Sequence, residues 1–169
     1  LGALKKAIEL AASLNPSAGG TFKPSTSKFS YSSGAIVRGD TLKKNIALVF
    51  TGHEFADGGD FIHKTLQAEK IKASFFFTGD FYRNSDFHAI IRKLKDQGHY
   101  LGAHSDKHLL YCDWNKRDSL LVTKARFRFD LADNYTAMVR YGIDVRRATY
   151  FLPPYEWYND SIAAWTKEL

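Results

Sequence analysis

The stretch Ile46-Ala47-Leu48-Val49-Phe50 is a continuous run of apolar residues that ends at the polar segment Thr51-Gly52-His53-Glu54. An unbroken apolar run of this length is typical of a parallel strand that is buried on both faces. Three later stretches have a similar character: Ala73-Ser74-Phe75-Phe76-Phe77, Tyr100-Leu101-Gly102-Ala103 and Thr149-Tyr150-Phe151-Leu152. We therefore predict four strands, the first two of them buried.

Segments with helical spacing of apolar residues follow these strands. The spacing and the end signals predict helices over residues 60–70, 86–97, about 123–141 and 159–169, the last capped by Asn159 or Asp160. Four strand-then-helix units in succession favour an α/β fold with a parallel sheet. The chain ends inside the last helix without a terminating signal, so we expect a small open sheet or an incomplete barrel.

The pattern before the first strand is different. Residues 1–14 have the spacing of an amphipathic helix, and residues 17–28 are rich in Ser, Gly and Pro, which indicates a linker. Short β-type runs at residues 29–31 and 35–37 flank a Ser-Ser-Gly segment and predict a small hairpin. We expect a single domain over residues 29–169, preceded by a helix and linker over residues 1–28.

Composition narrows the classes of function. The chain has 24 Lys and Arg against 18 Asp and Glu, a net charge of +6, but the basic residues are spread along the predicted helices. We therefore do not expect a nucleic-acid partner. Cys112 is the single cysteine, which excludes an internal disulfide and a thiolate metal cluster. We expect no membrane-spanning helix, because no apolar run reaches about 18 residues.

Three polar clusters directly follow predicted strands, where parallel α/β proteins gather functional groups. The most informative is His104-Ser105-Asp106-Lys107-His108, after the third strand. Histidines at i and i+4 can present both imidazoles to one cation from a helical turn, and neutral imidazole suits Zn²⁺ or another first-row metal. The alternative is a pair of solvent-exposed histidines, and spacing alone does not separate the two.

The cluster after the first strand contains His53, Glu54, Asp57 and Asp60. A metal site that takes two histidines from elsewhere usually needs a carboxylate as its third ligand, with one position left for water. The alternative is a glycine-rich polar loop in which Asp60 caps the next helix. That alternative accounts for Asp57 and Asp60 but not for His53 and Glu54, which lie nearest the strand end.

The cluster after the fourth strand begins with Pro153-Pro154, which sets an extended backbone and so gives the N–H of Tyr155 a fixed direction. A backbone N–H aimed into a pocket can serve as an oxyanion-hole donor, whereas the alternative is a rigid turn before a helix. Several flat rings near these loops could stack on a sugar or belong to the core: Tyr111, Trp114, Trp157 and Tyr158.

Taken together, the clusters resemble the polysaccharide deacetylase domain of carbohydrate esterase family 4, also called the NodB homology domain, over about residues 29–169. In that family a Thr-Phe-Asp-Asp-Gly motif follows the first barrel strand, His-Ser/Thr-x-x-His the third and Arg-Pro-Pro-Tyr/Phe the fourth. The second motif is intact here from His104 to His108, and Lys72-Ala73-Ser74-Phe75-Phe76-Phe77 resembles the family's second strand. The resemblance implies a distorted (β/α) barrel of which about the first four βα units are present.

The resemblance also implies a function, the metal-dependent hydrolysis of acetyl groups, usually N-acetyl groups, from a carbohydrate by a bacterial protein outside the cytoplasm. A divalent metal would be held by His104, His108 and Glu54, or by Asp57 in place of Glu54 at a different offset of the first motif. Zn²⁺ is the first expectation, and Co, Ni and Mn are alternatives. The remaining roles implied are a base at His53, an oxyanion-hole donor at the Tyr155 N–H and carbohydrate contacts from Trp157 and Tyr158.

Two positions depart from the family pattern. His53 stands where the family has an aspartate base, and Leu152 stands where it has an arginine that orients the base. The general acid of the family, in a later Leu-x-His motif, would lie beyond Leu169. We therefore keep two alternatives beside the enzyme: a catalytically impaired carbohydrate-binding pseudo-enzyme, and a non-catalytic α/β interaction domain.

Overall fold

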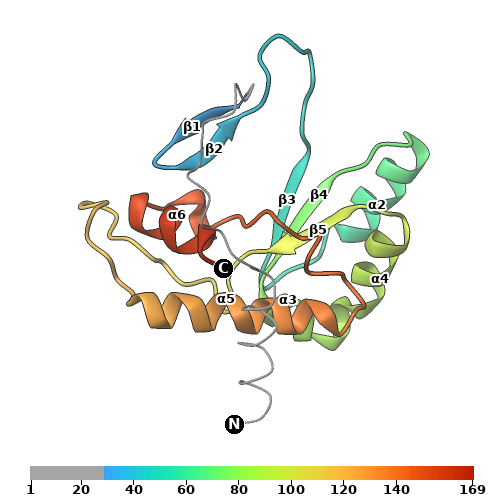
Figure 1. Cartoon of the computed structure of the whole chain (residues 1–169). Helices are drawn as coiled ribbons and strands as arrows, with labels where there is room; N and C mark the ends of the chain where they lie inside the picture. Colours follow the sequence, from blue (N-terminus) through green and yellow to red (C-terminus); the bar gives the residue numbers. More distant parts are fainter. Residues whose placement is uncertain (1–28) are drawn as a thin grey trace.

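Figure 1 shows the fold of the chain in a computed structural model that describes residues 29–169. The helix predicted over residues 1–14 and the linker over residues 17–28 lie outside these described residues. No helix of the described part is both long and apolar enough to span a bilayer.

A three-stranded parallel sheet forms the centre of the molecule, in the order β3-β4-β5. Its strands are β3 (Val49–Gly52), β4 (Ser74–Phe77) and β5 (Tyr100–Ala103), and Gly52, Phe77 and Ala103 are aligned at their carboxyl ends. The α/β class and the parallel sheet predicted from the sequence are therefore confirmed. The shared register brings the three strand ends to one edge of the sheet.

Helices surround this sheet, and several start at capping side chains. After β3 and β4 come α2 (Gly59–Ala68), α3 (Gly79–Arg83), the 3₁₀ turn η1 (Ser85–Phe87) and α4 (His88–Asp96). The later ones are α5 (Lys124–Val139), η2 (Pro154–Glu156) and α6 (Asp160–Lys167). Side chains of Thr78, Thr123 and Asn159 accept backbone N–H groups at the starts of α3, α5 and α6, as expected of N-caps.

The predicted hairpin is confirmed as β1 (Ser30–Ser32) paired antiparallel with β2 (Ala35–Arg38). It stands apart from the central sheet, above α6 in Figure 1. The Tyr158 hydroxyl, which comes from the segment before α6, donates a hydrogen bond to Ser32 O at 3.1 Å. This contact ties the hairpin to the polar cluster that follows Phe151.

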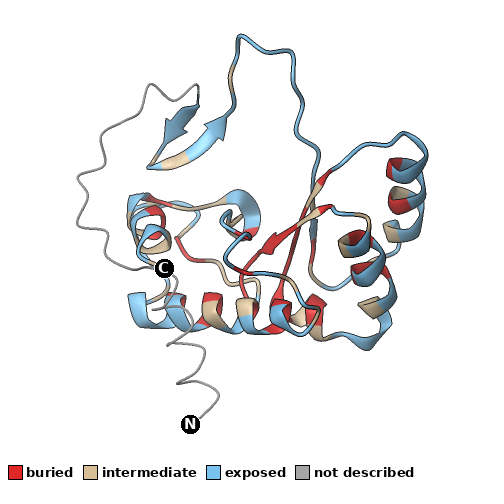
Figure 2. Cartoon of the chain, turned by 45° about the vertical axis from the view of Figure 1, so that its right-hand side comes forward, coloured by how far each residue is buried: buried red, intermediate tan, exposed pale blue. Residues whose placement is uncertain are grey.

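The buried residues gather in β4, β5 and the inner face of α5 (Figure 2). Phe77 stacks on Phe81 with ring centroids 4.1 Å apart, and Phe127 of α5 lies fully inside the core. Burial of such rings supplies much of the stability of a domain this size. A well-packed core therefore supports β4 and β5, the two strands that precede Thr78 and His104.

The first strand differs most from its prediction. A strand over residues 46–50 buried on both faces was expected, but β3 starts only at Val49, which is 48% exposed, and Ile46 is 88% exposed. β3 is an edge strand, and within residues 29–169 no strand pairs with its other side. An apolar run is buried on both faces only in a sheet interior covered by layers on both sides. The prediction of a fully buried first strand is therefore wrong.

The fourth predicted strand shrinks to a single parallel bridge between Phe151 and Ala103. Leu152 N donates to Ala103 O at 3.2 Å, but Pro153-Pro154 follow at once and have no N–H to continue the ladder. Within residues 29–169 the parallel sheet therefore has three strands, and the prediction of a fourth is wrong.

Two local predictions also need correction. The helix expected over residues 86–97 begins at His88, because the Asn84 side chain accepts the N–H of Asp86 and holds η1 in place instead. Asp60 does not cap α2, whose N-cap is Gly58; it lies in the first turn and pairs with Lys93 at 2.8 Å. The first difference arises from a side-chain contact that helical periodicity does not contain.

Candidate functional site

The carboxyl ends of the three strands bring together the residues that directly follow them. Thr78 N donates to Gly52 O at 3.1 Å, and His104 N donates to Phe77 O at 3.2 Å, so the ladder continues one residue past each strand. Across this edge, His53 Nδ1 and the Thr78 hydroxyl are hydrogen-bonded at 3.1 Å. The residues that follow β3 and β4 are thus neighbours in space.

Three histidines lie at this edge of the sheet. The rings of His53 and His108 are stacked with centroids 4.8 Å apart, and the rings of His104 and His108 meet edge to face at 5.0 Å. Together with Thr51, Gly52, Glu54 and Phe55 they line a cavity of about 270 Å³. The two histidines of the intact motif and the histidine at the base position therefore share one cavity.

His104 is held in one orientation by the protein backbone. Its Nδ1 is 2.7 Å from Leu152 O, a carbonyl that can only accept, so Nδ1 carries the proton and Nε2 keeps its lone pair. Burial lowers the pKa of His104 to about 4, so its imidazole is neutral at physiological pH. Burial and the neighbouring His53 also lower the pKa of His108. Neutral imidazoles of this kind are the form that binds metals.

The loop from His104 to His108 is not the helical turn expected from its i, i+4 spacing. Ser105 and His108 both have positive φ angles, 70° and 53°. The loop is instead held from α5, where Asp130 accepts hydrogen bonds from the backbone of Asp106 and Lys107, both at 3.1 Å. Such strained non-glycine residues persist only where the surrounding structure holds them, and they cluster at functional sites.

Two residues of α5 hold this loop and were missed by the sequence analysis. Asp130 also accepts the Tyr111 hydroxyl at 2.8 Å, and Asn134 accepts the N–H of His104 at 2.8 Å. Both side chains are buried. The signal that could have found them is their spacing: they are polar residues at i and i+4 on the face of α5 that carries Phe127 and Leu131.

A second support for the loop comes from the start of α3. Gly79 N donates to Ser105 O and Asp80 N donates to Asp106 O, at 3.1 and 3.2 Å. Arg83 binds both carboxylate oxygens of the buried Asp106, at 2.7 and 2.8 Å. The guanidinium is thus paired in the fork geometry that makes charge-assisted hydrogen bonds strong.

Gly79→Ala is expected to lower the free energy of unfolding by about 1–3 kcal/mol, the usual cost of overpacking. A methyl group at this position would lie 1.8 Å from Asp106 Oδ1, so Asp106 must leave Arg83. Gly39→Ala is the matched control, because a methyl group there meets nothing within 4 Å. Denaturant unfolding of both variants measures the difference, and equal midpoints would contradict a close contact between α3 and the histidine loop.

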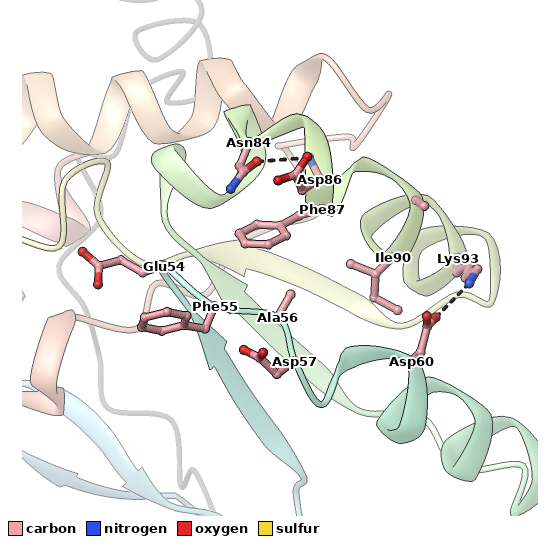
Figure 3. Close-up of a pocket in the computed structure, with 11 residues that line it drawn as sticks. Glu54, Phe55, Ala56, Asp57, Asp60, Asn84, Asp86, Phe87, Ile90 and Lys93 are labelled. Carbon is pink, nitrogen blue, oxygen red and sulfur yellow. Dashed lines mark hydrogen bonds and ion pairs between the residues drawn. The ribbon is translucent and has the colours of Figure 1, made fainter.

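The two candidate carboxylates lie in different places. Glu54 lines the histidine cavity, although its side chain is 68% exposed, and its Oε1 is 3.8 Å from His53 Nε2. Asp57 lines a neighbouring cavity of about 450 Å³, which Glu54 also lines, but it does not line the histidine cavity (Figure 3). Of the two, Glu54 is therefore the carboxylate near His104 and His108.

The fit to a metal ion is partial. The lone pair on His104 Nε2 and the adjacent His108 ring suit two ligands of a first-row metal. Within residues 29–169, however, no three His, Cys, Asp or Glu side chains converge closely enough to hold an ion together. The third ligand is the part that does not fit, because Glu54 faces His53 and solvent.

Tyr155 lies over the histidines. Its ring meets His108 edge to face at 4.5 Å, and its backbone is left-handed, with φ 61°. The hydrogen bonds of this short turn run from Glu156 N to Pro153 O and from Trp157 N to Pro154 O, and neither uses the Tyr155 N–H. The Tyr155 ring therefore reaches the histidine site and its N–H lies outside the turn's own hydrogen bonds, while its role as an oxyanion-hole donor stays a prediction.

Trp157 and Tyr158 make structural contacts. The Arg117 guanidinium lies over both rings, 4.3 Å from the Trp157 centroid and 5.2 Å from that of Tyr158. Both side chains are partly buried, and the Tyr158 hydroxyl is bonded to the β1–β2 hairpin. Their role in carbohydrate binding stays a prediction.

The comparisons with known proteins identify the family of the chain. The sequence profile described as "Polysaccharide deacetylase" matches residues 38–169. A family 4 carbohydrate esterase from Bacillus anthracis is similar over 76% of this chain and 57% of its own, with 27% identity and a TM-score of 0.65. No match was found among curated proteins.

Two further solved structures share the fold at lower identity. A peptidoglycan N-acetylglucosamine deacetylase is 21% identical, with a TM-score of 0.58, over 72% of this chain and 51% of its own. A family 4 pseudoenzyme from Bacillus anthracis is 19% identical, with a TM-score of 0.58, over 79% and 43%. The chain thus spans about half the length of the solved structures it matches.

Proposed function

The chain belongs to the polysaccharide deacetylase family. We propose that its three clustered histidines form part of a site that removes acetyl groups from a carbohydrate by hydrolysis, most of all N-acetyl groups. The observation that carries the proposal is the hydrogen bond from His104 Nδ1 to Leu152 O, which leaves Nε2 available beside His108. This backbone acceptor does not depend on the Leu152 side chain, so the absence of the family's arginine does not remove it.

We assign the proton-accepting role to His53. Its imidazole reaches the same cavity as His104 and His108, and it is hydrogen-bonded to Thr78 and 3.8 Å from Glu54. A base of this type takes the proton of the attacking water. The Tyr155 N–H would donate to the oxygen that becomes negative as the water adds to the acetyl carbonyl.

A divalent cation, with Zn²⁺ first, would be held here by His104 and His108. When bound, such an ion polarises the acetyl carbonyl and lowers the pKa of a water molecule. We propose Glu54 as the third ligand after a change of its side-chain rotamer, since its side chain is exposed and already lines the cavity. Acetylated structural polysaccharides lie outside the cytoplasm, and we propose that location for the protein.

The second candidate is a carbohydrate-binding pseudo-enzyme of the same fold. Two observations favour it: histidine replaces the expected aspartate at position 53, and the third metal ligand is not in place. One of the similar structures is itself described as a pseudoenzyme. Release of acetate by the complete protein from chitin or peptidoglycan fragments, and not from acetylxylan, is the result expected of an N-deacetylase.

His53→Gln is expected to reduce acetate release by about 10²–10⁴-fold while leaving metal content unchanged, because it removes a base and not a ligand. His88→Gln is the matched control, since His88 lies on α4 and packs against Tyr141 away from the cavity. If acetate release is equal in His53→Gln and the unsubstituted protein, His53 is not the base. If metal is lost together with activity, His53 is a ligand instead.

A further inference from the structure

Trp114 presents a large exposed ring close to the histidine cavity. It is 53% exposed, although a tryptophan side chain gains more than almost any other from burial. Its ring meets Tyr155 at 5.3 Å, and Tyr155 meets His108 at 4.5 Å. These two ring contacts form a row from His108 through Tyr155 to Trp114, so the centroid of the Trp114 ring lies within about 10 Å of that of His108.

The loop that carries Trp114 is rigid, so the exposure of its ring does not come from a loose segment. The Asp113 carboxylate accepts the N–H groups of Asn115 and Lys116, both at 2.8 Å. Asp113 N donates to Ser119 O at 2.9 Å, and Cys112 forms an isolated antiparallel β-bridge with Leu120. The turn is closed on both sides of Trp114.

The same loop is fastened to the segment that contains Tyr155. Trp157 Nε1 donates to Asp113 O at 3.2 Å, Arg117 Nε donates to Tyr158 O at 2.6 Å, and Asn159 Nδ2 donates to Arg117 O at 3.0 Å. The Trp157 ring lies 5.6 Å from that of Trp114 and supports it. Trp157 and Tyr158 therefore hold the Trp114 loop in place, and the Trp114 ring is the exposed part of this aromatic cluster.

From this arrangement we infer that Trp114 is a stacking subsite for the sugar next to the one that carries the acetyl group. The inference rests on the proposed function. A pyranose ring has a flat face of C–H groups that packs on an indole and a rim of hydroxyls that needs polar partners. Asn115 and Lys116, which follow Trp114 in the loop, and Glu156, which follows Tyr155, are exposed and are the candidates for such partners.

Carbohydrate is favoured over a protein partner because the exposed rings beside the cavity, Trp114 and Tyr155, form a narrow row and not a broad patch. Protein interfaces bury a broad patch, about 800 Å² on each side. The subsite makes the site prefer a chain over a single sugar. Binding energy from this remote contact would act on both the affinity and the orientation of the acetylated unit.

The test compares Trp114→Ala, Trp114→Phe and the control Phe61→Ala, which removes a 77% exposed ring from α2. In the complete protein, Trp114→Ala should raise KM for an N-acetylated oligosaccharide about tenfold and leave the KM for the N-acetylated monosaccharide unchanged. Trp114→Phe should recover part of the loss, and Phe61→Ala should match the unsubstituted protein.

Binding of the same oligosaccharide, measured by calorimetry, separates failure of this inference from failure of the proposed function. If no acetate is released but Trp114→Ala weakens binding, the subsite stands and the catalytic proposal falls. Equal binding and equal chain-length preference in Trp114→Ala and the unsubstituted protein overturn the subsite. If the unsubstituted protein neither binds nor deacetylates the glycan, both proposals are wrong, and a protein partner that binds only with Trp114 intact would replace them.

Discussion

His104→Ala is expected to remove bound divalent metal from the complete protein and to lower acetate release at least about 100-fold, more than the 10–100-fold typical of residues that only orient a ligand. His104 has a fixed tautomer, because its Nδ1–H donates a hydrogen bond to Leu152 O at 2.7 Å and leaves Nε2 free to bind the metal. Metal analysis of the purified variant, followed by an acetate assay, measures both effects.

Leu152→Ala is the matched control for His104→Ala. It keeps the carbonyl that accepts from His104 and removes only a partly buried side chain, so metal content should stay close to that of the unsubstituted protein. Unchanged metal content in His104→Ala would contradict the proposal that His104 is a metal ligand. Metal loss in Leu152→Ala would show that the side chain, and not the backbone, sets the histidine.

Asp130→Ala is expected to lower the free energy of unfolding by about 3 kcal/mol, because buried donors left without an acceptor cost about 1–3 kcal/mol each. Three groups lose the Asp130 carboxylate: the buried N–H of Asp106, the partly buried N–H of Lys107 and the hydroxyl of the buried Tyr111, which keeps its contact with Ser105. The loop from Ser105 to His108 would then relax from its positive φ angles, and metal affinity should fall with stability.

Denaturant unfolding and metal titration of Asp130→Ala and Asp130→Asn test this expectation. Asp133→Ala removes the same charge from the same helix and is the control, since Asp133 is not among the groups that hold the loop. Asp130→Asn keeps one oxygen acceptor and should lie between the other two variants. Equal unfolding midpoints for Asp130→Ala and Asp133→Ala would show that the loop does not depend on α5.

The sequence predicts the parts of this fold that depend on local pattern. The apolar runs before Thr78 and His104 become the buried strands β4 and β5, and Asn159 caps α6 as expected. It does not predict the exposure of β3, because burial depends on which strands and helices cover it. The fourth strand is limited to one bridge for a local reason, because the two prolines after Leu152 have no N–H to continue the ladder.

The candidate site shows the same division. Parallel strand ends explain why His53 and the His104–His108 loop meet in one cavity, and this could be predicted from their positions. The conformation of the loop could not, because its positive φ angles depend on Asp130 and Gly79, which are remote in sequence. The choice between Glu54 and Asp57 needed coordinates, since both follow the same strand.

Within residues 29–169 no strand pairs with the outer side of β3, and this has a consequence for handling the protein. A row of unpaired backbone N–H and C=O groups on a sheet edge is a template for strands of other molecules, and the adjacent exposed Ile46, Leu48 and Val49 make such pairing sticky. We therefore expect this edge to favour self-association of the protein at high concentration.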